Sequence, residues 1–304
     1  MEEQLLPRAE LKPAYGQAVW LYVYRDFSGS PADLAAERVC LRLGMTAYPQ
    51  HFLVHPETLD RMADTGRALD GFLAAMDRAR VEPAADLAAA ERVRDADARA
   101  AALQKSGSLE EARKALGETD PLLRIRALEI LAAKDPGSVV PRAASLLEVP
   151  NDPLRFLACD ALKKAAKPAA AKALEDAARA PRGSLNPNVL RMKCVEALGA
   201  CGDAGSVETI RPFAASGEFH NGLTRISVEA LVAIAARDPK ARPAVRDALA
   251  GGYPAPPADA GSRVPCLALA RSVHGALEAI TGRKVAFPGE YDEAARERLS
   301  KAWK

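Results

Sequence analysis

One short pattern recurs through the second half of the chain and constrains its fold more than any other feature. Each copy begins with a leucine. A small residue follows four positions after it, an aliphatic residue seven positions after it, and a second leucine eight positions after it. The four copies span residues 123–131, 154–162, 190–198 and 223–231. Their closing leucines are 31, 36 and 33 residues apart, a period typical of paired short helices that stack into a solenoid. Such a fold presents a surface, and the pattern alone names no chemistry.

The composition favours the same fold class. Hydrophobic residues make up 49% of the chain but aromatic residues only 5%, so most apolar side chains are small or aliphatic and suit closely packed helices. A length of 304 residues leaves room for a small domain before an extended array. We therefore predict a mainly α protein: an α-α solenoid with a small amino-terminal α/β unit over residues 1–81.

The amino-terminal unit shows alternating strand and helix signals. We expect a helix from Pro31, which suits a first helical position, to Leu43, with Gly44 as its stop. The other expected elements are a strand at 18–24, a strand at 50–54, an optional short strand near Met62 and a helix at 68–80. A unit this small buries little core, so we expect it to dock on the first repeat helices, a partner or a further segment.

Residues 43–56 resemble the thioredoxin-fold segment in which a cis-proline precedes a central strand, and residues 70–73 resemble the start of that fold's last helix. The resemblance implies that Pro49 is the cis-proline. The family's redox chemistry requires a reactive cysteine with a partner three residues away, and this unit lacks a C-x-x-C pair. Cys40, late in the 31–43 helix, is its single thiol, and we expect it to be an inert packing residue.

The rest of the chain divides into a capping helical pair at 82–119 and a repeat solenoid at 120–304. Ser108 and Glu111 form a capping-box pattern at the start of the second capping helix. The repeat register and residues 197–203 resemble short bacterial HEAT repeats. That resemblance implies a binding scaffold in which the second helix of each pair, the B helix, lines the concave side.

Charged residues supply the candidate binding positions. Arginines 124, 155 and 191 begin the first, or A, helices, where they either bind a partner or pair with groups of the adjoining turn. On the B helices we expect one row of positive charge, formed by Arg142, Lys172, Arg211 and Arg246. The alternative is that this row is neutralised by Glu175, Asp176, Glu208 and Asp247. The loop at 251–262 either connects helices or projects Tyr253 towards a partner.

Several function classes find no support in the sequence. A net charge of +2, from 42 basic and 40 acidic residues, gives no drive towards nucleic acid or anionic membranes. Five scattered cysteines indicate buried reduced thiols and, with no visible signal peptide, a cytoplasmic protein. His51 and His55 lie near Asp60 and Asp64, but no third ligand has convincing spacing. We predict no metal, no cofactor and no catalytic residue.

The sequence thus favours a non-catalytic protein-protein interaction scaffold whose partner is a protein that carries an acidic segment. Two enzyme classes are the alternatives. One is a thiol-redox protein of the thioredoxin class whose redox half is degenerate or missing, which requires an accessible, low-pKa cysteine. The other is a HEAT-like lyase, which requires a pocket with converging polar groups.

Overall fold

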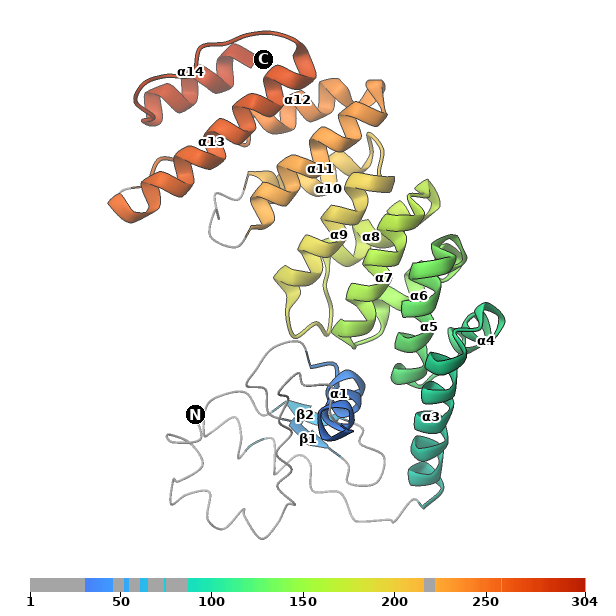
Figure 1. Cartoon of the computed structure of the whole chain (residues 1–304). Coiled ribbons are helices and arrows are strands. Elements are labelled where there is room, and N and C mark those ends of the chain that lie inside the picture. The colour runs from blue at the N-terminus through green and yellow to red at the C-terminus, as the bar shows by residue number, and fades with distance from the viewer. Residues whose placement is uncertain are drawn as a thin grey trace, which may run out of the picture. The chain divides into compact units, whose positions relative to one another are not determined.

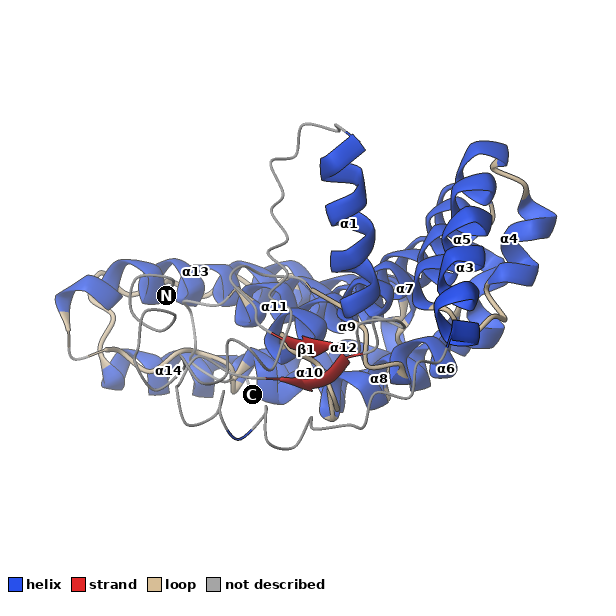
Figure 2. Cartoon of the chain, turned by 90° about the horizontal axis from the view of Figure 1, so that it is seen from below, coloured by secondary structure: helices blue, strands red, loops and turns tan. Residues whose placement is uncertain are grey.

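The computed structural model describes residues 31–45, 52–54, 61–64, 74, 87–215, 222–257 and 259–303. The described residues are predominantly helical, with one pair of short strands (Figure 2). The chain divides into two compact units, residues 1–127 with 151–153 and residues 128–150 with 154–304. The expected mainly helical architecture is confirmed. The predicted domain limits at residues 81 and 119 remain predictions.

The first unit contains the only two strands among the described residues. Its elements are α1 (Pro31–Leu43), β1 (Phe52–Val54), β2 (Arg61–Asp64), α3 (Leu87–Ser106), α4 (Leu109–Ala115) and the start of α5 (Pro121–Lys134). β1 and β2 are antiparallel, with Leu53 opposite Ala63 and an irregular register beside this pair. The bounds of α1 match the sequence-based prediction, and both strands fall where they were expected.

Other predictions for this unit lie outside the described residues. They are the strand at 18–24, the cis-proline Pro49, the histidines 51 and 55 and, apart from residue 74, the helix at 68–80. One helix and a two-stranded hairpin are too little to support the thioredoxin resemblance. The capping-box prediction is confirmed in part, because Ser108 Oγ accepts a hydrogen bond from Glu111 N (3.3 Å). The Glu111 carboxylate instead accepts from the Ser106 hydroxyl (2.9 Å).

Helix α1 docks on the first repeat helices, as expected. The Arg42 side chain is 7% exposed and donates to Asp97 on α3 (2.6 Å) and to Asp120, just before α5. Asn151 Nδ2 donates to the carbonyl of Leu41 (2.9 Å), near the end of α1. One buried cation thus holds two carboxylates, which offsets part of the desolvation cost that an unpaired buried charge would carry.

The second unit is built from paired helices. In chain order it contains the rest of α5, η2 (Pro136–Arg142), α6 (Ala143–Glu148), most of α7 (Asp152–Ala165), η3 (Pro168–Ala170), α8 (Ala171–Arg179), α9 (Pro187–Cys201), α10 (Ser206–Ala214), α11 (Leu223–Arg237), η4 (Pro239–Ala241), α12 (Arg242–Ala250), α13 (Ala260–Thr281) and α14 (Glu293–Trp303). Helix α11 packs between α9 and α13 (Figure 1). The B helices α6, α8, α10 and α12 contact one another in series. This succession of stacked pairs is an α-solenoid.

The repeated sequence pattern forms the core of this solenoid. In the copies on α7 and α9, all four pattern positions are completely buried: Leu154, Ala158, Ala161 and Leu162, and Leu190, Cys194, Ala197 and Leu198. Between α9 and α11 the backbones approach closely, because a Cβ at Gly199 would lie 3.1 Å from the Cα of Ala230. The period read from the sequence is therefore the period of core packing.

Arginines satisfy carbonyl groups at the ends of these helices. Arg155 is 2% exposed and donates to the carbonyls of Glu148 (3.1 Å) and Arg182 (2.7 Å). Arg191 donates to the carbonyl of Ala178 (3.3 Å). The last carbonyls of a helix have no partner within the helix, so these contacts supply what the helix ends lack. For these two arginines, the interpretation in which they pair with groups of the turns is confirmed.

Candidate functional site

The four cations predicted to form one row on the B helices do not share one helical position. Arg211 and Arg246 each follow the buried residue at the centre of their helix, Ile210 and Val245. Lys172 instead precedes the corresponding buried Leu174 by two positions, and Arg142 ends η2, before α6 begins. The predicted common register is wrong, because the connection from the A helix to the B helix is not constant: it spans residues 135–142, 166–170, 202–205 and 238–241.

Three of these cations pair with carboxylates of their own helices. Lys172 lies 2.7 Å from Asp176, Arg211 lies 2.8 Å from Glu208, and Arg246 lies 2.7 Å from Asp247. All these side chains are at least one third exposed, so each pair contributes little to stability. The pairs do reduce the net charge of the face, as the alternative interpretation expects. Partner binding by Arg142, Lys172, Arg211 and Arg246 stays a prediction.

The A helices carry a reciprocal set of ion pairs. Lys163 on α7 lies 2.6 Å from Glu196 on α9, and Lys193 on α9 lies 2.8 Å from Asp160 on α7. On α11, Arg225 pairs with Glu229 within the helix (2.5 Å). The recurring acidic residues of the A helices are thus paired at a solvated face.

All five cysteines are buried, as the sequence analysis expects: Cys40, Cys159, Cys194, Cys201 and Cys266. The thiols of Cys159 and Cys194 lie 3.6 Å apart between α7 and α9, and their hydrogen bond, together with burial, raises the pKa of Cys159 well above its usual value. Burial raises the pKa of Cys201 to about 11. Because the thiolate is the reactive form, these environments disfavour nucleophilic or redox chemistry.

Tyr253, in the loop for which both a connecting and a partner-contacting role were considered, is 3% exposed and lies against α13 and α14. Trp303 Nε1 donates to the Tyr253 hydroxyl (3.0 Å), which lies 2.9 Å from His274 Nδ1, and His274 Nε2 lies 2.7 Å from the carbonyl of Val285. The carbonyl can only accept, so Nε2 carries a proton and donates to Val285. Partner binding by Tyr253 stays a prediction, while its ring and hydroxyl take part in this interior network.

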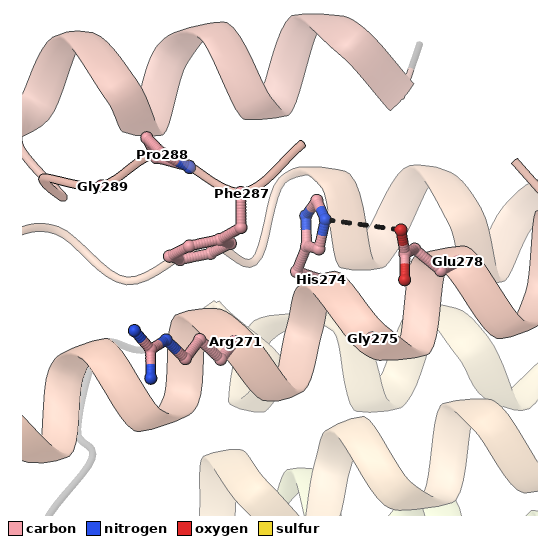
Figure 3. A pocket seen from close by; sticks show the side chains of 7 residues that line it. All are labelled: Arg271, His274, Gly275, Glu278, Phe287, Pro288 and Gly289. Carbon is pink, nitrogen blue, oxygen red and sulfur yellow. Dashed lines mark ion pairs between the residues drawn. The ribbon is translucent and has the colours of Figure 1, made fainter. Parts of the chain in front are cut away.

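A pocket of about 470 Å³ opens beside this network (Figure 3). Its lining residues are Arg271, His274, Gly275, Glu278, Phe287, Pro288 and Gly289. Arg271, Gly275 and Glu278 follow helical spacing and therefore share one face of α13. The loop after α13 supplies the opposite wall, in which the ring of Phe287 stacks on Tyr291 at 6.0 Å.

The two charged side chains of this pocket, Glu278 and Arg271, differ in the partners that they have. Glu278 accepts from Lys284 Nζ (3.1 Å) and from Val285 N (3.4 Å), and the Lys284 hydrogen bond lowers the pKa of the carboxyl. The guanidinium carbon of Arg271 lies 5.8 Å from the centre of the Phe287 ring. None of the pocket residues was named as a candidate from the sequence, so this site was missed. The spacing of Arg271, Gly275 and Glu278 on one helix was the available signal.

Neither a metal centre nor a membrane segment is seen in the parts of the chain that the structure describes. No group of three His, Cys, Asp or Glu side chains within those parts is placed to hold a metal ion. Every helix among the described residues is too short or too polar to cross a membrane.

Comparison with known proteins identifies one segment. No curated protein and no solved structure matches the chain. Residues 109–186, from α4 to the turn before α9, match a family model described as HEAT repeats. The matched segment has the alternating A and B helices seen above. The resemblance read from the repeat pattern is therefore supported over this segment: residues 109–186 are similar to HEAT repeats, and the paired helices of the second unit form an α-solenoid.

Proposed function

We propose that this chain is a non-catalytic scaffold that binds another protein along the exposed face of its B helices. The observation that carries the proposal is the serial contact of α6, α8, α10 and α12, which gives a continuous surface instead of isolated helices. Solenoids commonly use such extended, concave surfaces for binding. HEAT repeats at residues 109–186 support the same class of function.

The charges on this face indicate the chemistry of the partner. Arg211 and Arg246 occupy equivalent positions on neighbouring B helices, which pack about 8–10 Å apart. Their exposed pairs with Glu208 and Asp247 are weak enough for a partner carboxylate to replace or share. A protein with a short acidic segment fits these two cations, and Lys172 and Arg142 extend the charged face towards α6.

The test compares two double charge reversals. The first variant carries Arg211→Glu and Arg246→Glu on the B helices. The matched control carries Lys163→Glu and Lys193→Glu on the A helices, with the same change in net charge. We expect a protein captured from native lysate by the unmodified chain and by the control to be lost from the B-helix variant, while circular dichroism shows all three folded.

The interaction is then measured with the purified pair. The B-helix reversal is expected to weaken binding by about tenfold or more, and the affinity of the unmodified chain to fall as salt is added. Equal retention of the partner by both variants, or weaker binding only by the A-helix control, overturns the proposal.

A further inference from the structure

We propose that the pocket on α13 is a second binding site, which takes the last residues of a peptide with a free carboxyl terminus. The residues involved belong to α13 and the loop that follows it (Figure 3). None of them lies on the B helices α6, α8, α10 and α12, so this site stands apart from the proposed scaffold face.

Arg271 supplies the anchor for the terminal carboxylate. Among the described residues it pairs with no carboxylate, and its one contact of note is with the Phe287 ring, 5.8 Å from the guanidinium carbon. A guanidinium presents a planar fork of donors that matches a carboxylate in bidentate geometry. The contact with the Phe287 ring favours a position of the Arg271 guanidinium beside the pocket. Figure 3 shows Arg271 and Phe287 at the same end of the pocket.

Glu278 marks the opposite end of the pocket. Lys284 and Val285 N hold its carboxylate in place, and His274 Nε2 lies 3.8 Å from Glu278 Oε1 (Figure 3). The two carboxylate oxygens retain further acceptor sites. It can therefore accept a backbone N–H of a ligand, and it repels a second carboxylate. The buried ring of His274 already uses both nitrogens and offers the ligand no further bond.

The spacing of the two charged ends sets the length of the ligand. Arg271 and Glu278 are separated by seven residues of helix, a rise of about 10 Å. An extended chain covers about 3.3–3.6 Å per residue, so about three residues bridge that distance. A single carboxylic acid is too short to reach both ends.

The middle of the pocket admits a peptide backbone. A Cβ added at Gly275 would meet nothing within 4 Å, and the same holds at Gly289. The half-buried Phe287 and Pro288 form an apolar wall beside them. The pocket volume of about 470 Å³ falls within the usual range for small-ligand sites. The chemistry therefore favours a terminal tripeptide with an apolar last side chain.

The test is an NMR titration of the full chain with three probes. They are acetyl-Ala-Ala-Phe with a free carboxylate, the same tripeptide as its carboxyl amide, and N-acetylphenylalanine. We expect the free-acid tripeptide to shift the amide signals of Gly275 and Gly289. The amide and the single amino acid should each bind about tenfold more weakly, because one charge-assisted contact is lost in each case.

Two variants on the same helix complete the test. Arg271→Gln is expected to weaken the free-acid tripeptide about tenfold, and the matched Arg263→Gln, outside the pocket, to leave it unchanged. Equal binding of acid and amide, equal effects of the two variants, or no shift with the tripeptide overturns the proposal. Equal binding of N-acetylphenylalanine also overturns it, in favour of a site for small carboxylic acids. The B-helix reversal should retain tripeptide binding, which separates this outcome from that of the scaffold proposal.

Discussion

The hydroxyl group of Tyr253 joins three aromatic side chains that lie far apart in the sequence. It accepts from Trp303, 50 residues later, and shares a hydrogen bond with His274, 21 residues later. Both partners are buried, so neither can turn to water when the hydroxyl is absent. At the scale of single residues, the stability of the second unit depends on complete hydrogen bonding of its buried polar groups as well as on the burial of apolar area.

Replacement of Tyr253 by Phe is therefore expected to lower the free energy of unfolding by about 1–3 kcal/mol, because it leaves two buried polar atoms without partners. The control is Tyr291→Phe, which removes one hydrogen bond, to the carbonyl of Pro254, from a half-buried side chain. Urea denaturation of both variants measures the difference. A Tyr253→Phe variant no less stable than the Tyr291→Phe variant would contradict the network.

The same hydroxyl predicts a pH dependence. Burial raises the pKa of Tyr253 from 10.0 to about 12, so the folded state holds this proton more tightly than the unfolded state. Its contribution to stability is complete below pH 10 and is lost as the pH rises through about 12, an effect of about 2–3 kcal/mol. The stability advantage of the unmodified protein over Tyr253→Phe should shrink between pH 10 and 12. An advantage that stays constant over this range would exclude the raised pKa.

At the scale of helices, the absence of a side chain sets how closely two elements approach. Gly199 on α9 faces the backbone of α11, and a methyl group there would lie 3.1 Å from the Cα of Ala230. Gly275 on α13 has open space at the same place. The two glycines are both inside helices but meet different surroundings, so substitution by alanine should act on them in opposite directions.

We expect Gly199→Ala to destabilise the protein by about 1–3 kcal/mol through overpacking. Gly275→Ala should stabilise it by about 0.5–1 kcal/mol, because alanine is the better helix former and nothing obstructs its methyl group. Thermal melting of both variants supplies the comparison. A Gly199→Ala variant that melts no lower than the unmodified protein would show that α9 and α11 can move apart at little cost, and a Gly275→Ala variant that melts lower would contradict the open space at that position.

Prediction from the sequence succeeded where local rules decide the structure. The bounds of α1 follow from Pro31 at its start and Gly44, with φ of 72°, after its end. The repeat pattern located the buried positions of α7 and α9, because helical periodicity specifies which face is covered. The prediction of a common B-helix register failed, because the connection between the A helix and the B helix depends on packing that the pattern does not encode.

The candidate pocket was beyond sequence reasoning for a related physical cause. Tyr253 lies in a Gly- and Pro-rich stretch, which locally indicates an exposed loop. Its burial is decided by α13 and α14, which come later in the chain. The pocket likewise needs the Phe287–Gly289 loop to fold back over α13. Contacts of this kind arise from tertiary packing. The one feature of the pocket that can be recognised in the sequence is the helical spacing of Arg271, Gly275 and Glu278.

At the scale of the second unit, each helix pair is stabilised mainly by its neighbours, as in other solenoids. Helix α13 packs on α11 and α12, and α14 packs on α12. The pair that they pack on, α11 and α12, has buried apolar residues that include Ile234, Val245 and Leu249. Helices α13 and α14 therefore act as a cap for that pair.

Stepwise truncation tests this capping role. Removal of residues 251–304 should lower the melting temperature more than removal of residues 283–304, because the longer deletion takes α13 as well as α14 from the apolar face. It should also increase binding of a dye that reports exposed apolar surface. Equal melting temperatures for the two truncated chains would show that α13 covers nothing essential.

The bond between Trp303 and Tyr253 also affects how this unit forms during translation. The two partners are 50 residues apart, a stretch that the ribosome completes in about 3–10 s at about 5–20 residues per second. During that interval the earlier repeats can already stack, while Tyr253 and His274 lack the indole that completes their network. The network beside the pocket thus closes only once Trp303 is available, later than the stacking of the repeats that precede it in the chain.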